Sequence, residues 1–135
     1  MTQVIIFTNE DGGVSVCYPT GELPIDEVQA KDTPAGSIIV DNDTLPNEYM
    51  DFFNAWELSG TTVTVNLDKA KEITKQRLRI ERTPLLQAQD VAFQRALESG
   101  TDTTAIVAEK QRLRDVIALA DQATTLDELK SLGVA

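Results

Sequence analysis

The spacing of hydrophobic residues changes once along this chain, near residue 66. Before that point, short apolar runs alternate with polar residues and are separated by turn-forming residues, a pattern typical of β-strands. After it, apolar residues recur about every 3.6 positions, which is the period of an α-helix. We therefore predict an α+β fold, in which a small antiparallel β-rich amino-terminal module (1–66) precedes a helical hairpin with a short terminal helix (67–135).

The amino-terminal module is predicted to contain four or five strands and one short helix. Residues 3–8 and 14–18 flank the turn-forming sequence NEDGG, so they predict a β-hairpin. The remaining strands are expected at 37–41, 53–58 and 61–66, and the helix at 23–31. Such a set of elements can close a compact layer with one sheet face to cover.

A long amphipathic helix is predicted over residues 67–99, with Asn66 as its N-cap and Gly100 after its last turn. Pro84 removes one helical hydrogen bond, so the helix either kinks there or restarts with Thr83 as a new cap. The apolar side expected to face inward carries Ala70, Ile73, Ile80, Ala88 and Val91. The opposite side carries four cations, here called the basic row: Lys71, Lys75, Arg79 and Arg82.

Two further helices are predicted, over residues 103–122 and 126–132. The connection between the first two helices is short, so they should be antiparallel neighbours. Thr125 and Glu128 have the spacing of a capping box at the start of the last helix. The inward residues of the middle helix are expected to be Ile106, Leu113, Val116, Ile117 and Ala120.

Charge is divided unevenly between the two halves. The chain of 135 residues has 12 Lys and Arg against 22 Asp and Glu, a formal net charge of -10. Eleven acidic residues and Lys31 lie in residues 1–66, whereas residues 67–135 hold eleven acidic and eleven basic residues. The whole negative charge therefore belongs to the β-rich half, which indicates two structural regimes.

The sequence offers little chemistry for catalysis. It has no histidine and one cysteine, Cys17, which excludes the nucleophile–imidazole pairs and leaves no cysteine framework for a disulfide or a zinc site. No phosphate-binding glycine motif occurs. The acidic sequences at 9–13 and 41–43 are interpreted as β-turns, with weak calcium binding as the alternative. We therefore expect no enzyme activity, no catalytic, metal-binding or cofactor-binding residue, and no cofactor.

The amino-terminal apolar run, residues 4–7, is too short for a signal sequence or a membrane span. No membrane partner is expected, and the protein should be made in the cytoplasm. The basic row could bind phosphates, but an acidic half at −10 would repel a polyanion, so nucleic acid is not expected as a partner. A solvated face, or contact with an acidic surface of the same chain, a neighbouring subunit or another protein, is favoured.

Two segments of the helical half, RIERTPLLQAQD (79–90) and KQRLRD (110–115), resemble the helical domain of phage tail assembly chaperone-like proteins. The amino-terminal half resembles small proteins found among the tail genes of tailed phages and prophages. The resemblance implies a non-enzymatic tail protein of the virion, at the tail fibre or baseplate, that acts through protein–protein contacts. A tail-fibre assembly chaperone absent from the mature virion is the alternative. The implied partners are other phage tail proteins of the fibre, baseplate or tube, and the chain is expected to form a homo-oligomer.

Within the same segments, four charged residues could fix the register of the helical hairpin. Charge-assisted hydrogen bonds across two antiparallel helices would require cations and carboxylates on facing sides. The candidates are Arg82, Asp90, Arg114 and Asp115. The alternative interpretation is that they are surface charges, each with little effect on stability.

Overall fold

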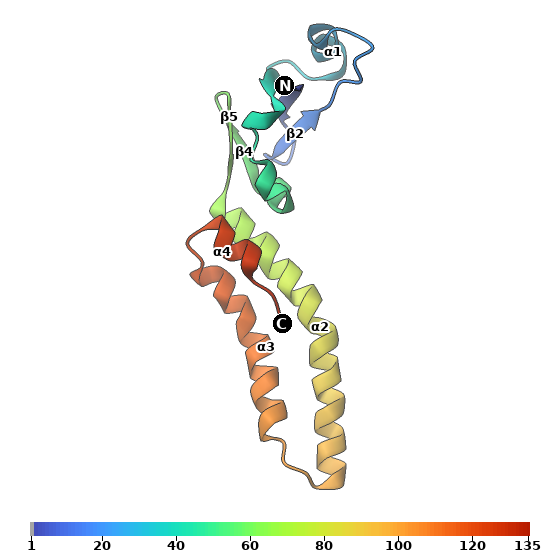
Figure 1. Cartoon of the computed structure of the whole chain (residues 1–135), viewed down its shortest axis with the longest axis vertical. Coiled ribbons are helices and arrows are strands. Elements are labelled where there is room, and N and C mark those ends of the chain that lie inside the picture. The colour runs from blue at the N-terminus through green and yellow to red at the C-terminus, as the bar shows by residue number, and fades with distance from the viewer. Residues whose placement is uncertain (1) are drawn as a thin grey trace. The chain divides into compact units, whose positions relative to one another are not determined.

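The structure is a computed structural model that describes residues 2–135. It confirms the α+β class, with antiparallel strands at the amino terminus and long helices after them (Figure 1). The elements are β1 (Gln3–Thr8), β2 (Val14–Cys17), α1 (Ile25–Asp32), β3 (Ile38–Asp41), the 3₁₀ segments η1 (Asn42–Thr44) and η2 (Asn47–Ala55), β4 (Trp56–Ser59), β5 (Thr62–Val65), α2 (Leu67–Ser99), α3 (Thr104–Gln122) and α4 (Leu126–Ser131). The chain divides into two compact units, one ending at Ala70 and the other comprising Lys71–Ala135.

The amino-terminal unit is built on a three-stranded antiparallel sheet of order β2-β1-β3 and a separate hairpin of β4 and β5. Ile6 of β1 pairs with Val16 of β2, and Val4 pairs with Val40 of β3. The predicted hairpin between β1 and β2 is confirmed. Its turn is closed by Asn9, whose Oδ1 accepts hydrogen bonds from the backbone amides of Asp11 and Gly13.

The core of this unit lies on one side of β1. Val4, Ile6, Val14, Leu45, Trp56 and Val63 form a single buried cluster. The indole Nε1 of buried Trp56 donates to the carbonyl of Tyr49 at 3.2 Å, so its polar atom is satisfied. Ile5, on the other face of β1, is also fully buried, and α1 lies against this strand. The middle strand is therefore apolar without alternation.

The predicted strand 53–58 is wrong in its first half. Residues before Trp56 belong to η2, and β4 begins only at Trp56. Phe52, Ala55 and Trp56 are all buried, a three- and four-residue spacing that suits a helical turn better than a strand. The predicted helix 23–31 is present but runs over Ile25–Asp32, after Pro24.

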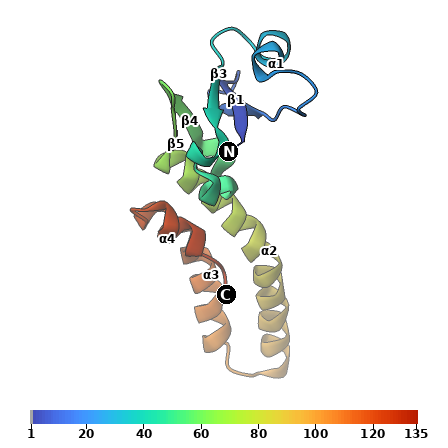
Figure 2. The same cartoon turned by 45° about the horizontal axis from the view of Figure 1, so that its top comes forward.

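The carboxy-terminal unit contains the antiparallel α2–α3 hairpin followed by α4, as both views show (Figures 1 and 2). The backbone amide of Lys69 donates to Asn66 Oδ1 at 3.0 Å, which confirms Asn66 as the cap of α2. Thr125 likewise caps α4 by accepting from the Glu128 amide. Both helices after α2 start and end within one residue of the predicted bounds.

Candidate protein–protein interface

Helix α2 carries two apolar stripes, and only one is packed within the chain. The packed stripe contains Ala70, Thr74 and Leu78, one residue per turn, and all three are fully buried. On α3 the buried residues Leu113, Val116 and Ala120 confirm the predicted inward side of that helix, whereas the predicted Ile106 and Ile117 are only half-buried.

Four of the five residues predicted to face inward on α2 lie outside the packed stripe: Ile73 is half-buried, and Ile80, Ala88 and Val91 are exposed. Together with Pro84 these four residues form an outer stripe, and at about 100° per residue its members lie within about 80° of one another. Ile80 is 73% exposed and Val91 50%, while Ala70 alone of the predicted set is fully buried. Periodicity identifies such stripes but does not tell which one faces α3, because the small residues Ala70 and Thr74 also permit close helix packing.

Pro84 lies in the outer stripe, and α2 continues through it. The proline nitrogen cannot donate to the carbonyl of Ile80, but Ile80 is on the exposed side, where water can satisfy that carbonyl. Thr83, the residue directly before Pro84, donates its Oγ1 hydrogen to the Arg79 carbonyl at 2.7 Å. Of the two alternatives at Pro84, the restart with Thr83 as a cap is therefore excluded.

Three members of the basic row make contacts inside the hairpin. The ammonium of Lys75 lies 2.5 Å from Asp121 of α3 and 3.0 Å from Glu72, and its hydrogen bond to Asp121 raises the pKa of Lys75. Lys71 Nζ donates to the main-chain carbonyl of Asp121 at 3.2 Å. The basic row therefore borders the seam between α2 and α3.

Arg82 bonds to the facing helix only through main-chain oxygens. Its Nη1 donates to the carbonyls of Leu113 and Arg114 at 3.3 and 3.2 Å. A neutral carbonyl orients the guanidinium but leaves its charge uncompensated. Within residues 2–135, Arg79, the remaining member of the row, forms no ion pair.

The predicted register set is only partly brought together. Asp90 does reach α3, but its partner is Lys110, at 2.6 Å, and Lys110 also lies over the Phe93 ring, 5.2 Å from its centroid. Asp115 instead accepts from Gln111 of its own helix at 2.8 Å. In the described part of the chain the Arg114 side chain forms no ion pair. The prediction that all four side chains pair across the seam is therefore wrong, because Asp115 lies about 100–160° around α3 from its buried residues and Arg114 has no carboxylate partner within the described residues.

Two arginines that sequence reasoning missed hold the carboxy-terminal segment. Arg77 Nη2 donates to the carbonyls of Leu129 and Leu132, at 3.2 and 2.8 Å. Arg112 pairs with Glu109 and donates to the Val134 carbonyl at 2.8 Å. The last carbonyls of a helix have no donor within the helix and need one from elsewhere. The predicted end of α4 was therefore the signal that cationic side chains would bond there.

The hairpin thus has two different sides. At about 100° per residue, Lys75, Arg79 and Arg82 lie about 140–160° around α2 from Arg77. On α3, Arg114 and Asp121 lie about 160–180° around the helix from Arg112. One side is therefore occupied by α4 and the carboxy-terminal segment. The other, here called the open side because α4 does not cover it, carries the basic row, whose four residues are partly buried.

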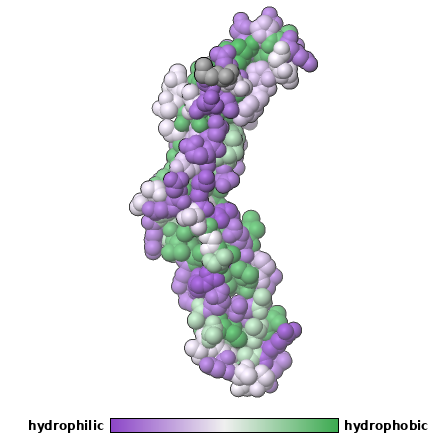
Figure 3. Space-filling model, viewed as in Figure 1, coloured by the Kyte–Doolittle hydropathy of each residue, from purple (hydrophilic) through white to green (hydrophobic). Residues whose placement is uncertain are grey.

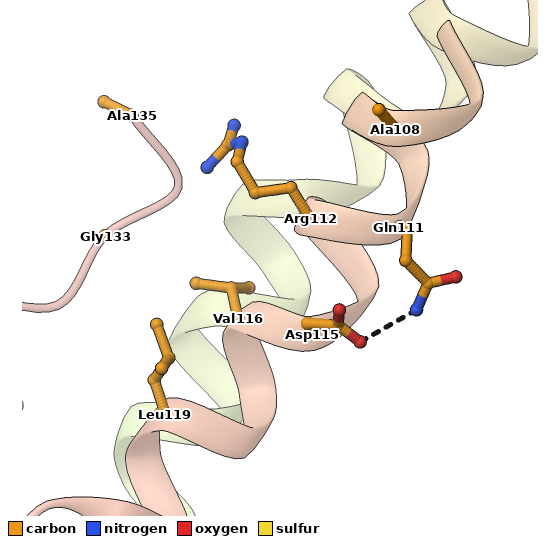
Figure 4. Close-up of a pocket in the computed structure, with 8 residues that line it drawn as sticks. All are labelled: Ala108, Gln111, Arg112, Asp115, Val116, Leu119, Gly133 and Ala135. Atoms are coloured by element: carbon orange, nitrogen blue, oxygen red, sulfur yellow. Dashed lines mark hydrogen bonds between the residues drawn. The ribbon is translucent and has the colours of Figure 1, made fainter. Parts of the chain in front are cut away.

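A cavity of about 640 Å³ lies between α3 and the carboxy-terminal segment. Val116, Leu119 and Arg112 point toward this segment, and Gly133 and Ala135 border the cavity on the far side (Figure 4). Leu119 is 46% exposed, so the cavity presents apolar surface to a binding partner. Hydrophobic side chains reach the surface at several places on the helical unit in Figure 3.

The described residues do not assemble a metal-binding cluster. Residues 2–135 contain no group of three or more His, Cys, Asp or Glu placed to hold a metal ion. Asp41 of the acidic turn at 41–43 uses its Oδ1 to accept from the Asp43 amide. In the same range, no helix combines the length and the apolar character needed to cross a membrane. What the arrangement offers is apolar and cationic surface for another macromolecule.

Compared with known proteins, the chain matches no family model, no curated protein and no solved structure.

Proposed function

We propose that this chain is a non-enzymatic phage tail protein that acts through protein–protein contacts, as a structural component of the virion at the tail fibre or baseplate. The phage assignment rests on the resemblance of residues 79–90 and 110–115 to tail assembly chaperone-like proteins. The mode of action rests on the surface of the helical unit.

The observation that carries the proposal is the exposed outer stripe of α2. Ile80 and Val91 are large apolar residues on one side of a helix, and Pro84 and Ala88 continue the apolar surface between them. Recognition of helices by partner proteins commonly uses anchors at this spacing. Fully burying an isoleucine or valine side chain stabilises a complex by about 1.5–3 kcal/mol, so two anchors contribute substantially to binding.

A tail-fibre assembly chaperone is the second candidate. The same exposed stripe would serve it, since a chaperone must bind apolar surfaces of subunits before they assemble. The two candidates differ in the final location of the chain. A structural component stays in the finished particle, whereas a chaperone leaves it.

The role of the outer stripe can be tested with charged substitutions in phage that produce the protein. Ile80→Asp and Val91→Asp are expected to lower the amount of this chain retained on purified particles by about tenfold or more, because a carboxylate in an apolar contact is costly. Leu97→Asp is the matched control, since Leu97 is a 57% exposed residue of the same helix that lies outside the stripe. Equal retention of all three variants would contradict the assignment of this stripe.

A further inference from the structure

The open side of the hairpin carries a surplus of positive charge. Its cations are Lys71, Lys75, Arg79 and Arg82 of α2 and Arg114 of α3, which we call the basic face. Three carboxylates lie among them or one turn away on the same side of α2: Asp68, Glu72 and Asp121, of which Glu72 and Asp121 are ion-paired with Lys75. Five cations against three carboxylates leave two positive charges in excess.

The basic face is also held in place. Lys71 and Arg82 are fixed by hydrogen bonds to main-chain carbonyls of α3, which orient these side chains and leave their charges free to act on a partner. Cations that are already ordered lose less side-chain entropy when they bind. This distinguishes the basic face from a scatter of mobile surface lysines.

The chain itself carries a strongly acidic surface, whose negative charge is complementary to the basic face. Residues 2–70 hold twelve carboxylates and two lysines, a formal net charge of -10, whereas residues 71–135 hold ten of each sign and are neutral. The exposed acidic residues of this unit include Glu22, Asp26 and Glu27. The same negative charge would repel a nucleic acid from the molecule.

We propose that the basic face binds the acidic amino-terminal unit of a second copy of this chain. The opposite charges of the two surfaces favour this contact, and contact within one chain is the alternative that isotope-resolved cross-linking distinguishes. The two surfaces are different, so the contact is heterologous. Such contacts repeat from copy to copy and close into a ring or extend into a filament. This inference specifies one contact of the proposed function.

Sedimentation equilibrium of the full chain tests the contact. We expect association at about 50 mM salt that weakens by about tenfold or more at about 500 mM, where the Debye length is only a few ångströms. Arg79→Glu should weaken association by about tenfold, because Arg79 forms no ion pair within the described chain and its reversal leaves the hairpin intact. Arg95→Glu is the matched control, with the same charge change on the same helix but about 160° away from Arg79.

Zero-length carbodiimide cross-linking of mixed ¹⁴N- and ¹⁵N-labelled chains identifies the occupant. Cross-links of mixed isotope between Lys71 or Lys75 and carboxylates of residues 2–66 are the expected result.

A monomer at low salt, equal effects of Arg79→Glu and Arg95→Glu, or cross-links within single chains only would overturn the inference. Binding of a DNA duplex that Arg79→Glu abolishes, with self-association unchanged, would also overturn it. If the chain is a monomer in solution but Ile80→Asp still removes it from particles, the self-association is wrong and the proposed function is unaffected. The two failures are therefore distinguishable.

Discussion

Single side chains show that this protein uses charge to fix local structure as well as to present a surface. Glu57 is one example in the amino-terminal unit. Asn66 Nδ2 donates to Glu57 Oε1 at 2.8 Å, while Asn66 Oδ1 caps α2, and Lys69 lies 3.5 Å from Glu57 Oε2. The hydrogen bond from Asn66, together with the charge of Lys69, lowers the pKa of Glu57. One asparagine therefore links the start of β4 to the start of α2.

The stability provided by Glu57 should depend on pH. Because the pKa of Glu57 is lowered in the folded state, its contribution is present above the usual pKa near 4.5 and is lost as the pH falls through the lowered value. Glu57→Gln should therefore be less stable than the wild type at pH 7, and by a smaller margin at about pH 3. Urea unfolding at the two pH values measures this, and a difference that persists unchanged in acid would contradict it.

At the level of elements, α2 shows where sequence reasoning is sufficient and where it stops. The caps at Asn66 and Thr125 and the bounds of α3 followed from local chemistry, which depends on a few neighbouring residues. The inward side of α2 did not, because two stripes have the same period and the choice depends on α3. The contacts of Arg77 and Arg112 with distant carbonyls were likewise beyond a pattern read along the chain.

The assignment of the two stripes can be measured by paired substitutions. Leu78→Ala should lower the free energy of unfolding by about 2–5 kcal/mol, because Leu78 is fully buried and its truncation leaves a cavity. Ile80→Ala should change it by about 0.5 kcal/mol or less, since most of that side chain is already in water. A larger loss of stability in Ile80→Ala than in Leu78→Ala, measured by denaturant unfolding, would show that the stripe predicted from periodicity is the packed one.

Pro84 gives a second prediction for this element. Pro84→Ala restores a backbone donor for the Ile80 carbonyl in an otherwise continuous helix. The substitution should stabilise the protein by about 1–3 kcal/mol and raise its melting temperature in circular dichroism. Gln87→Ala, at an exposed position of the same helix one turn later, is a control for helix propensity alone. A loss of stability in Pro84→Ala would mean that the proline fits a bend that alanine does not reproduce.

For the molecule as a whole, the net charge of -10 is divided unevenly between the two units. The excess of negative charge belongs to the amino-terminal unit, while the helical unit is neutral overall but carries a basic face on one side and apolar surface on another. Those surfaces are suited to protein partners, and the proposed function requires that the chain be part of an assembly.

Quantitative mass spectrometry of purified, washed phage particles tests this requirement most directly. The account predicts the chain at a fixed number of copies per particle, retained through washing and present in every preparation. Its absence from particles whose infectious yield nevertheless depends on it would contradict a structural role and favour an assembly chaperone.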